Sequence, residues 1–563
     1  MKTITTSKSR TKNSTRNVTW NVANFAITTI LSFVTRTFFV LYLGDTYAGL
    51  NGFFINIIAV LSLFEFGVGT AIIYALYKPI AENNLSKINA LVRLFQKINL
   101  LVVLIMSAIG LAFMPLIPYL IAGEIPATTN IFLVHALFIF IAVIPFFFKH
   151  RRILFLVYQR DDIATKITFG QSLLLNTAKI LIIVFAHSFL FVVVSMVVAI
   201  FLDNLVMYII SVKCYSDVTG KNVLPLEKSE KKWIVKYTGS MVVHKVGGIV
   251  VFGTDSILIS ALFGLVVLGH FSNYLLLFTS ITSLIGVIFS ATQGSVGNLI
   301  AQKTPKEAYE VYRRLNFMLA LFVGFCFIAF FTLFQPFMEV WLGVDRQLTF
   351  ITVALMCVSF YLTGLRRVNG IFLDCAGLLN KTMFNPIAEV PVKLGASIGL
   401  GIWLGLPGVI LGTIISTLTT VFWLEPKILY KHYFKDEKVR NFFGLVAIYT
   451  LITAAIGAVV FFTVWWIPTG NISWFALKTA VTVFITAGLL ILVYFRHPHF
   501  KYFIGLAKRI LQRKKREEVV EEVIENTLVE ASSESLSKEE SFNKNNIAVV
   551  ENDVAVDDSM MVE

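Results

Sequence analysis

Long apolar segments recur along almost the whole 563-residue chain, separated by short polar connections. A helix that crosses a bilayer needs about 20 mostly apolar residues. The predicted spans are 18–43, 46–76, 99–121, 130–148, 167–186, 188–211, 237–263, 265–291, 317–340, 348–367, 385–404, 406–426, 444–467 and 474–494. The pattern predicts an all-α polytopic membrane protein with about fourteen transmembrane helices.

Basic residues orient these spans. If the N-terminus is cytoplasmic, the alternate connections hold 40 of the 48 lysines and arginines, and the outside connections hold only Arg346. Short cytoplasmic loops of membrane proteins carry such an excess. The sequence therefore predicts a multi-pass protein of the plasma membrane with both termini in the cytoplasm. The outside turns at 44–45, 187–188, 264 and 405–407 are too short for a folded extracellular domain.

Composition agrees with a membrane protein and disfavours a soluble one, since 56% of the residues are hydrophobic and only 15% are charged. The net charge of +14 conceals an acidic tail, residues 517–563, which carries 14 acidic and 2 basic residues. The remainder is strongly basic, but its charge lies in loops between spans, so membrane lipids rather than nucleic acid are the expected partners. The tail is predicted to be disordered and cytoplasmic.

An offset of 220 residues relates the two halves of the chain. Gly44 and Gly49 match Gly264 and Gly269, and in each half a tight turn joins two long helices. The predicted domains are a basic N-terminus (1–17), a first six-helix lobe (18–211), a linker (212–236), a second lobe (237–426), two added helices (444–494) and a cytoplasmic tail (495–563). Transporters built from two similar halves bind substrate between them.

Several segments resemble the bacterial polysaccharide flippases of the multidrug/oligosaccharidyl-lipid/polysaccharide exporter superfamily. They begin with Arg36-Thr37-Phe38-Phe39 and Tyr47-Ala48-Gly49-Leu50-Asn51-Gly52, and continue at 61–72, 77–83, 295–298 and 405–416. The resemblance covers roughly residues 15–495. It implies two six-helix lobes in a V around a central cavity, plus two C-terminal helices, working by alternating access.

The substrate that the resemblance implies is a polyprenyl-diphosphate-linked oligosaccharide, moved to the outer leaflet for capsule or exopolysaccharide assembly. A polysaccharide polymerase and glycosyltransferases are the implied protein partners. One position departs from the pattern, because Lys393 stands where the family commonly has an uncharged polar residue.

Charged residues inside spans are costly, so they are the best candidates for a site. Arg36 and Asp255 lie at similar depth, eight and nine residues before the turns at Gly44 and Gly264. They are predicted to form a cavity-lining pair that acts as an outer gate between the lobes. The alternatives are a static pair, or separate partners within each lobe. Lys179 competes as a partner for Asp255. The basic excess in the spans, at Arg36, Lys179, Lys245 and Lys393, favours an anionic substrate that these residues bind.

Further candidates come from the remaining charges in and beside the spans. Glu389 and Lys393, four residues apart, share a helix face and can pair. Lys245 is a candidate phosphate ligand, and the alternative is a lysine that reaches the cytoplasmic headgroups. Glu65, Glu389 and Asp203 are candidates for ion coupling, and the alternative for Glu65 is a pair with a loop lysine such as Lys78. Arg366 and Arg367 make the predicted inner mouth basic, either as substrate ligands or as ordinary topology signals.

The sequence contains no recognisable catalytic motif, nucleotide-binding loop or metal-ligand spacing, so the prediction is a transporter, not an enzyme, with no cofactor and no metal. An ion-coupled multidrug/cation antiporter of the same superfamily is the first alternative, and it should have a carboxylate-dominated site. A membrane scaffold of a polysaccharide assembly complex, docked through the tail, is a second. A membrane-embedded polymerase or glycosyltransferase would need a large outer loop or a sugar-nucleotide domain.

Overall fold

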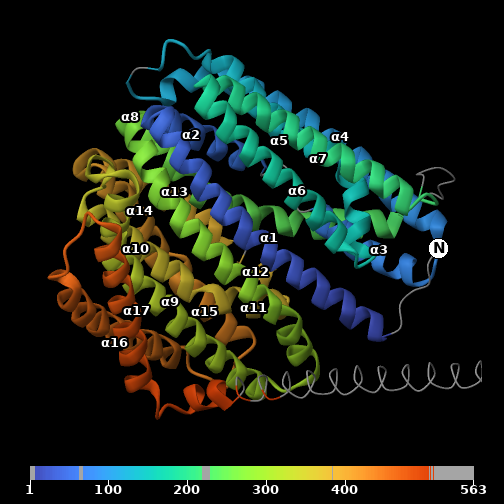
Figure 1. Ribbon diagram of the computed structural model, residues 1–563. Coiled ribbons are helices and arrows are strands. Elements are labelled where there is room, and N and C mark those ends of the chain that lie inside the picture. Colours follow the sequence, from blue (N-terminus) through green and yellow to red (C-terminus); the bar gives the residue numbers. More distant parts are fainter. Residues whose placement is uncertain are drawn as a thin grey trace, which may run out of the picture. The chain divides into compact units, whose positions relative to one another are not determined.

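The computed structural model describes residues 7–62, 68–123, 125–218, 228–382, 384–505, 508 and 512, and in that part of the chain it is built from helices without strands (Figure 1). The helices are α1 (Ser7–Tyr42), α2 (Asp45–Leu61), α3 (Val68–Ala81), α4 (Leu85–Phe113), η2 (Met114–Leu120), α5 (Ile131–Val157), α6 (Asp161–Leu181), η3 (Ile182–Ala186), α7 (Phe189–Cys214), α8 (Lys228–Gln302), α9 (Pro305–Leu342), η4 (Val344–Arg346), α10 (Phe350–Leu365), α11 (Arg367–Cys375), α12 (Leu379–Thr382), α13 (Phe384–Leu404), α14 (Leu406–Thr419), α15 (Val421–His432), α16 (Val439–Trp465) and α17 (Ile472–Tyr494).

The predicted class, an all-α polytopic membrane protein, is confirmed, whereas the count of fourteen spans is not. Twelve helices in the described part of the chain are long and apolar enough to cross a bilayer. The predicted span 46–76 corresponds to two shorter helices, α2 and α3, instead of one long one. The predicted span 406–426 is also divided, because the backbone leaves the helical conformation at Thr420 between α14 and α15.

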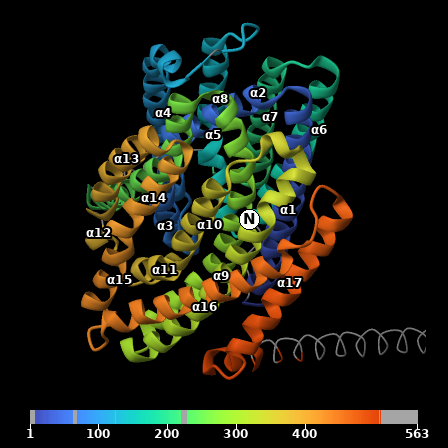
Figure 2. The same cartoon turned by 90° about the vertical axis from the view of Figure 1, so that its left-hand side faces the viewer.

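The described residues up to Leu489 belong to one compact unit, and those from Leu490 onward to another. Within the first unit α5 packs against α4 and α7, and α1 packs against α6. In the second half of that unit α9 packs against α10 and α16, and α13 against α14 (Figure 2). The lobe and linker boundaries given above stay predictions.

Local sequence explains where the longest regular helix of the second half begins. Thr304 precedes Pro305, whose fixed φ suits the first turn of a helix. The Thr304 hydroxyl accepts a hydrogen bond from the Glu307 amide, and the Glu307 carboxylate accepts one from the Thr304 amide. This reciprocal capping satisfies amides that would otherwise lack partners at the start of α9.

The contact between α2 and α8 joins the two halves, and glycines permit it. A Cβ atom on Gly49 would collide with the backbone carbonyl of Leu265, and one on Gly269 would collide with that of Asp45. Both collisions involve residues related by the 220-residue offset, so the repeat predicted from the sequence becomes a symmetric helix crossing. Without side chains at these two positions, the backbones approach closely, as is common between membrane helices.

Candidate functional site: a polar closure and a buried charge network

A cluster of polar residues bridges the two halves beside the turns at Gly44, Gly264 and Gly343, which we call the glycine-turn end. Gly264 interrupts α8 with a φ of 84°, where L side chains are strained, and so divides α8 as the sequence predicts. Asp45 begins α2 directly after Gly44, so its carboxylate also lies at the positive end of a helix dipole.

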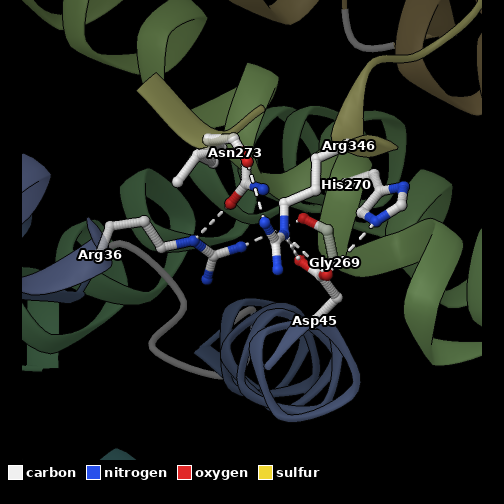
Figure 3. Close-up of polar contacts among 7 residues, drawn as sticks. Arg36, Asp45, Gly269, His270, Asn273 and Arg346 are labelled. Atoms are coloured by element: carbon white, nitrogen blue, oxygen red, sulfur yellow. Dashed lines mark hydrogen bonds and ion pairs between the residues drawn. The ribbon is translucent and has the colours of Figure 1, made fainter. Parts of the chain in front are cut away.

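Asp45 holds the first half against two residues of the second (Figure 3). The Nε atom of Arg346 donates to both carboxylate oxygens of Asp45, at 3.1 and 2.9 Å. His270 Nε2 lies 3.6 Å from Asp45 Oδ2. Both side chains of the Asp45–Arg346 pair are less than 30% exposed, so water screens the interaction less than on an open surface.

Arg36 makes a second bridge at the same end. Its Nε atom donates to Asn273 Oδ1 at 2.6 Å, and its Nη2 atom donates to the Gly269 carbonyl at 3.2 Å (Figure 3). Nearby, the Trp341 indole donates to the Thr37 hydroxyl at 2.7 Å. Arg36 and Thr37 are adjacent on α1, while their partners lie on α8 and α9, so this end of the molecule is closed by contacts between its halves.

The predicted pairing of Arg36 with Asp255 is wrong in this structure, and so is the alternative pairing of Lys179 with Asp255. Asp255 forms an ion pair with Lys393, whose Nζ lies 2.9 Å from Oδ1, and it accepts from the Thr413 hydroxyl at 3.3 Å. The carboxylate therefore has its cation within the second half. Arg36 does bridge the halves, as the gate hypothesis required, but through an amide and a carbonyl.

Lys393 is part of a longer network of buried charges. Its side chain is only 1% exposed, and Glu389, one turn earlier on α13, is also buried and accepts from the Thr417 hydroxyl at 3.4 Å. Glu389 also interacts electrostatically with Lys393 and Arg366. Glu389 and Lys393 therefore interact electrostatically without forming a close ion pair. The close ion pair of Lys393 is with Asp255 on the neighbouring helix α8.

Arg366 closes this network at its other end. Its guanidinium donates to both carboxylate oxygens of Glu425 on α15, at 3.1 and 2.6 Å. Such a two-pronged pair fixes the arginine tightly. Arg367, the next residue, is exposed, and its Nη2 atom would meet a Cβ placed on Gly286 of α8. Of the two arginines predicted at the inner mouth, Arg367 is the one whose guanidinium is exposed and able to bind a substrate.

The first half contains two further candidates. Lys179 on α6 forms no ion pair or hydrogen bond within the part of the chain that the structure describes. One turn earlier, Asn176 accepts from the Thr35 hydroxyl at 2.9 Å, which ties α6 to α1 beside Arg36. Asp203 is 8% exposed and has Arg152 as its electrostatic neighbour. Glu65 and the side chain of Lys245 lie outside the described residues.

Sequence reasoning missed the partners in the glycine-turn cluster, Asp45, His270 and Asn273. The sequence did contain a signal that Arg346 has a specific partner, which is Asp45 in the structure. Arg346 is the only lysine or arginine in the predicted outside connections. Outside loops of membrane proteins contain few lysines and arginines, so a single arginine there is expected to have a specific acidic partner. That partner could not be read from the sequence, since Asp45 lies 301 residues away.

The Arg36–Asn273 bond gives a first prediction. A hydrogen bond to a charged group contributes about 1.5–3 kcal/mol, which corresponds to roughly a ten- to hundredfold change in an equilibrium. We expect Asn273→Ala to reduce closure of the glycine-turn end by that factor, as does Arg36→Gln. Adding the second substitution to the first should change little. Closure is measured as thiol labelling of a cysteine placed at buried Leu268, and additive effects of the two substitutions would contradict a shared contact.

Comparison with known proteins identifies relatives of this architecture. The sequence family described as "Polysaccharide biosynthesis protein" matches residues 14–293. No curated protein matches the chain. Among solved structures, a lipid II flippase, MurJ, in an inward closed conformation has a TM-score of 0.55 and 15% identity, covering 85% of this chain and 99% of its own.

Two other solved structures are transporters of the MOP superfamily. An inward-facing multidrug resistance MATE family transporter has a TM-score of 0.55 and 15% identity, covering 71% of this chain and 94% of its own. A Pyrococcus furiosus transporter described as having a binding pocket of reverse polarity has a TM-score of 0.50 and 15% identity, covering 75% of this chain and 96% of its own. At these identities the structural likeness establishes the fold.

Proposed function

We propose that this multi-pass membrane protein, whose residues 14–293 carry the sequence pattern of polysaccharide biosynthesis proteins, is a flippase for polyprenyl-diphosphate-linked oligosaccharide. Its MATE-like and MurJ-like fold is that of proteins that move solutes or lipids across membranes. The proposed route carries the diphosphate and sugars between the two halves while the polyprenyl chain stays in the bilayer. Alternating access then opens the glycine-turn end, which the charge distribution places outside the cell.

The ammonium group of Lys179, unpaired in the part of the chain that the structure describes, is the observation that most supports an anionic substrate. An ammonium group on a membrane helix is costly without a counter-charge, and this one lacks an ionic partner among the described residues. Arg36, on the adjacent helix, spends its hydrogen bonds on an amide and on carbonyls, so its charge is not neutralised by direct contact with a carboxylate. A diphosphate between α1 and α6 would supply the missing negative charge to both.

The network around Lys393 is the proposed coupling element. Asp255 and Glu425 are each paired with a cation, whereas Glu389 has, among the residues that the structure describes, a hydroxyl donor and more distant charges. A buried carboxylate without its own cation can take up a proton or a metal cation as the halves rearrange. The antiporter alternative needs free carboxylates at its binding site, and two of the three carboxylates here are already paired.

Translocation by the purified, reconstituted protein tests the proposal. Liposomes containing a fluorescent polyprenyl-diphosphate oligosaccharide should lose inner-leaflet label at a rate well above protein-free liposomes. Lys179→Gln should slow this by at least about tenfold, the effect of roughly 1.4 kcal/mol. Lys166→Gln, which removes an exposed charge from the same helix, is the matched control.

Two outcomes would contradict the proposal. One is equal transport of a polyprenyl-linked sugar that lacks the diphosphate. The other is unchanged transport by Lys179→Gln. Removal of residues 517–563 should leave translocation intact, and its loss would favour the scaffold alternative.

A further inference from the structure

A groove opens between the starts of α9 and α16, away from the polar closure and the buried network. Its volume is about 720 Å³, which lies within the usual range of small-molecule sites. Its walls include Glu310 and Arg313 from α9, and Glu437, Arg440, Leu445 and Ile448 from α16 and the loop before it. Because α9 and α16 pack side by side, the occupant of this groove would touch both helices (Figure 2).

The polar end of the groove carries equal numbers of opposite charges. Arg313 Nη1 lies 3.5 Å from Glu310 Oε1, and both side chains are more than a third exposed, so this contact is weak. Arg440 is exposed and forms no ion pair within the described part of the chain. Two guanidinium groups and two carboxylates therefore line the groove, and the ion pair among them, Arg313–Glu310, is weak.

The other end of the groove is apolar and lies further along the membrane-crossing part of α16. Leu445 lines the wall, and Ile448, one turn deeper, is 52% exposed. Beneath them a narrower pocket shares Arg313 and Leu445 and is lined by the rings of Tyr312, Tyr430 and Phe442. These three rings are almost fully buried, so they form a packed aromatic floor below the groove.

We infer that the α9–α16 groove binds a zwitterionic phospholipid with a phosphoethanolamine headgroup. The phosphate pairs with Arg313 and Arg440, since guanidinium groups match phosphate oxygens. The ammonium pairs with Glu310 and Glu437, and the acyl chains follow Leu445 and Ile448 into the bilayer. The bound lipid braces α16, one of the two added helices, against the core of the second half.

Charge balance is what favours this headgroup over an anionic one. A phosphoglycerol headgroup offers the same phosphate but no ammonium, so both carboxylates would face a net negative ligand. A headgroup with one negative and one positive centre compensates both pairs of side chains. The inference concerns a bound lipid and stands apart from the proposed transport of oligosaccharide.

Native mass spectrometry of the full chain tests it, with phosphatidylethanolamine or phosphatidylglycerol added separately to the detergent-purified protein. The unaltered protein should retain phosphatidylethanolamine preferentially. The double variant Arg313→Gln/Arg440→Gln should retain it about tenfold less, since charge-assisted bonds to phosphate are the stronger ones. Lys435→Gln, an exposed neighbour outside the groove wall, should retain it normally.

A second double variant separates this site from a generally basic surface. Glu310→Gln/Glu437→Gln should shift the preference toward phosphatidylglycerol, because it leaves the two arginines without carboxylates. Equal retention of both lipids by the unaltered protein, or retention unaffected by loss of the arginines, would overturn the inference. Thermal unfolding of each variant verifies that the loss of lipid does not reflect a loss of fold.

Discussion

Replacing Lys393 by methionine is expected to destabilise the protein by about 3–5 kcal/mol, the usual cost of leaving one member of a buried ion pair alone. Lys393 is almost fully buried, and its ammonium lies 2.9 Å from Asp255. Removal of the cation leaves a carboxylate that is about one-fifth exposed and retains only the Thr413 hydroxyl as a hydrogen-bond donor among the described residues. Asp255→Asn should be costly for the converse reason. Thermal unfolding in detergent measures both.

The double variant Asp255→Asn/Lys393→Met gives the sharper result. Because neither charge remains, it should recover most of the stability that each single substitution loses, whereas independent sites would add their costs. Lys427→Met, at an exposed position on α15, is the control for loss of a lysine. A double variant that is less stable than both single variants would show that the two charges do not act as a pair.

The positions of most apolar segments could be predicted from the sequence because hydrophobic length is a local property. The turn at Gly264 was predicted for the same reason, and the structure places it between the two helical parts of α8. The end of α2 at Leu61, inside the predicted span 46–76, was not predicted. Residues 46–76 form one mostly apolar run, and such a run does not by itself show where one helix ends and the next begins.

The sequence does not determine which distant charged residues pair with each other. Depth counting placed Arg36 and Asp255 at one level, but depth fixes only one of the three coordinates that decide a contact. The rotation of α13 about its axis directs Lys393 at α8, and that rotation follows from packing against α14 and α8. Five of the ten candidate site residues, Arg36, Asp255, Arg366, Glu389 and Lys393, nevertheless belong to the two polar centres described here.

The crossing of α2 and α8 leads to the second large effect. We expect Gly49→Ala and Gly269→Ala each to prevent closure of the glycine-turn end, because the added methyl group would collide with a backbone carbonyl, which cannot rotate away as a side chain can. Overpacking of this kind costs about 1–3 kcal/mol, so the closed form should become roughly 5- to 150-fold less populated relative to the open form.

Thiol labelling of Leu268→Cys, with the four native cysteines replaced, measures this shift, since Leu268 is fully buried in the closed structure. Gly170→Ala is the matched control, because a Cβ at this helical glycine meets no atom within 4 Å. Labelling should rise in the Gly49 and Gly269 variants and not in the control.

The two glycines are equivalent positions of the repeat, so they should behave alike. A large effect at one with none at the other would contradict a symmetric crossing. Since alternating access requires both ends to close in turn, a variant held open at this end should also lose translocation while keeping its fold.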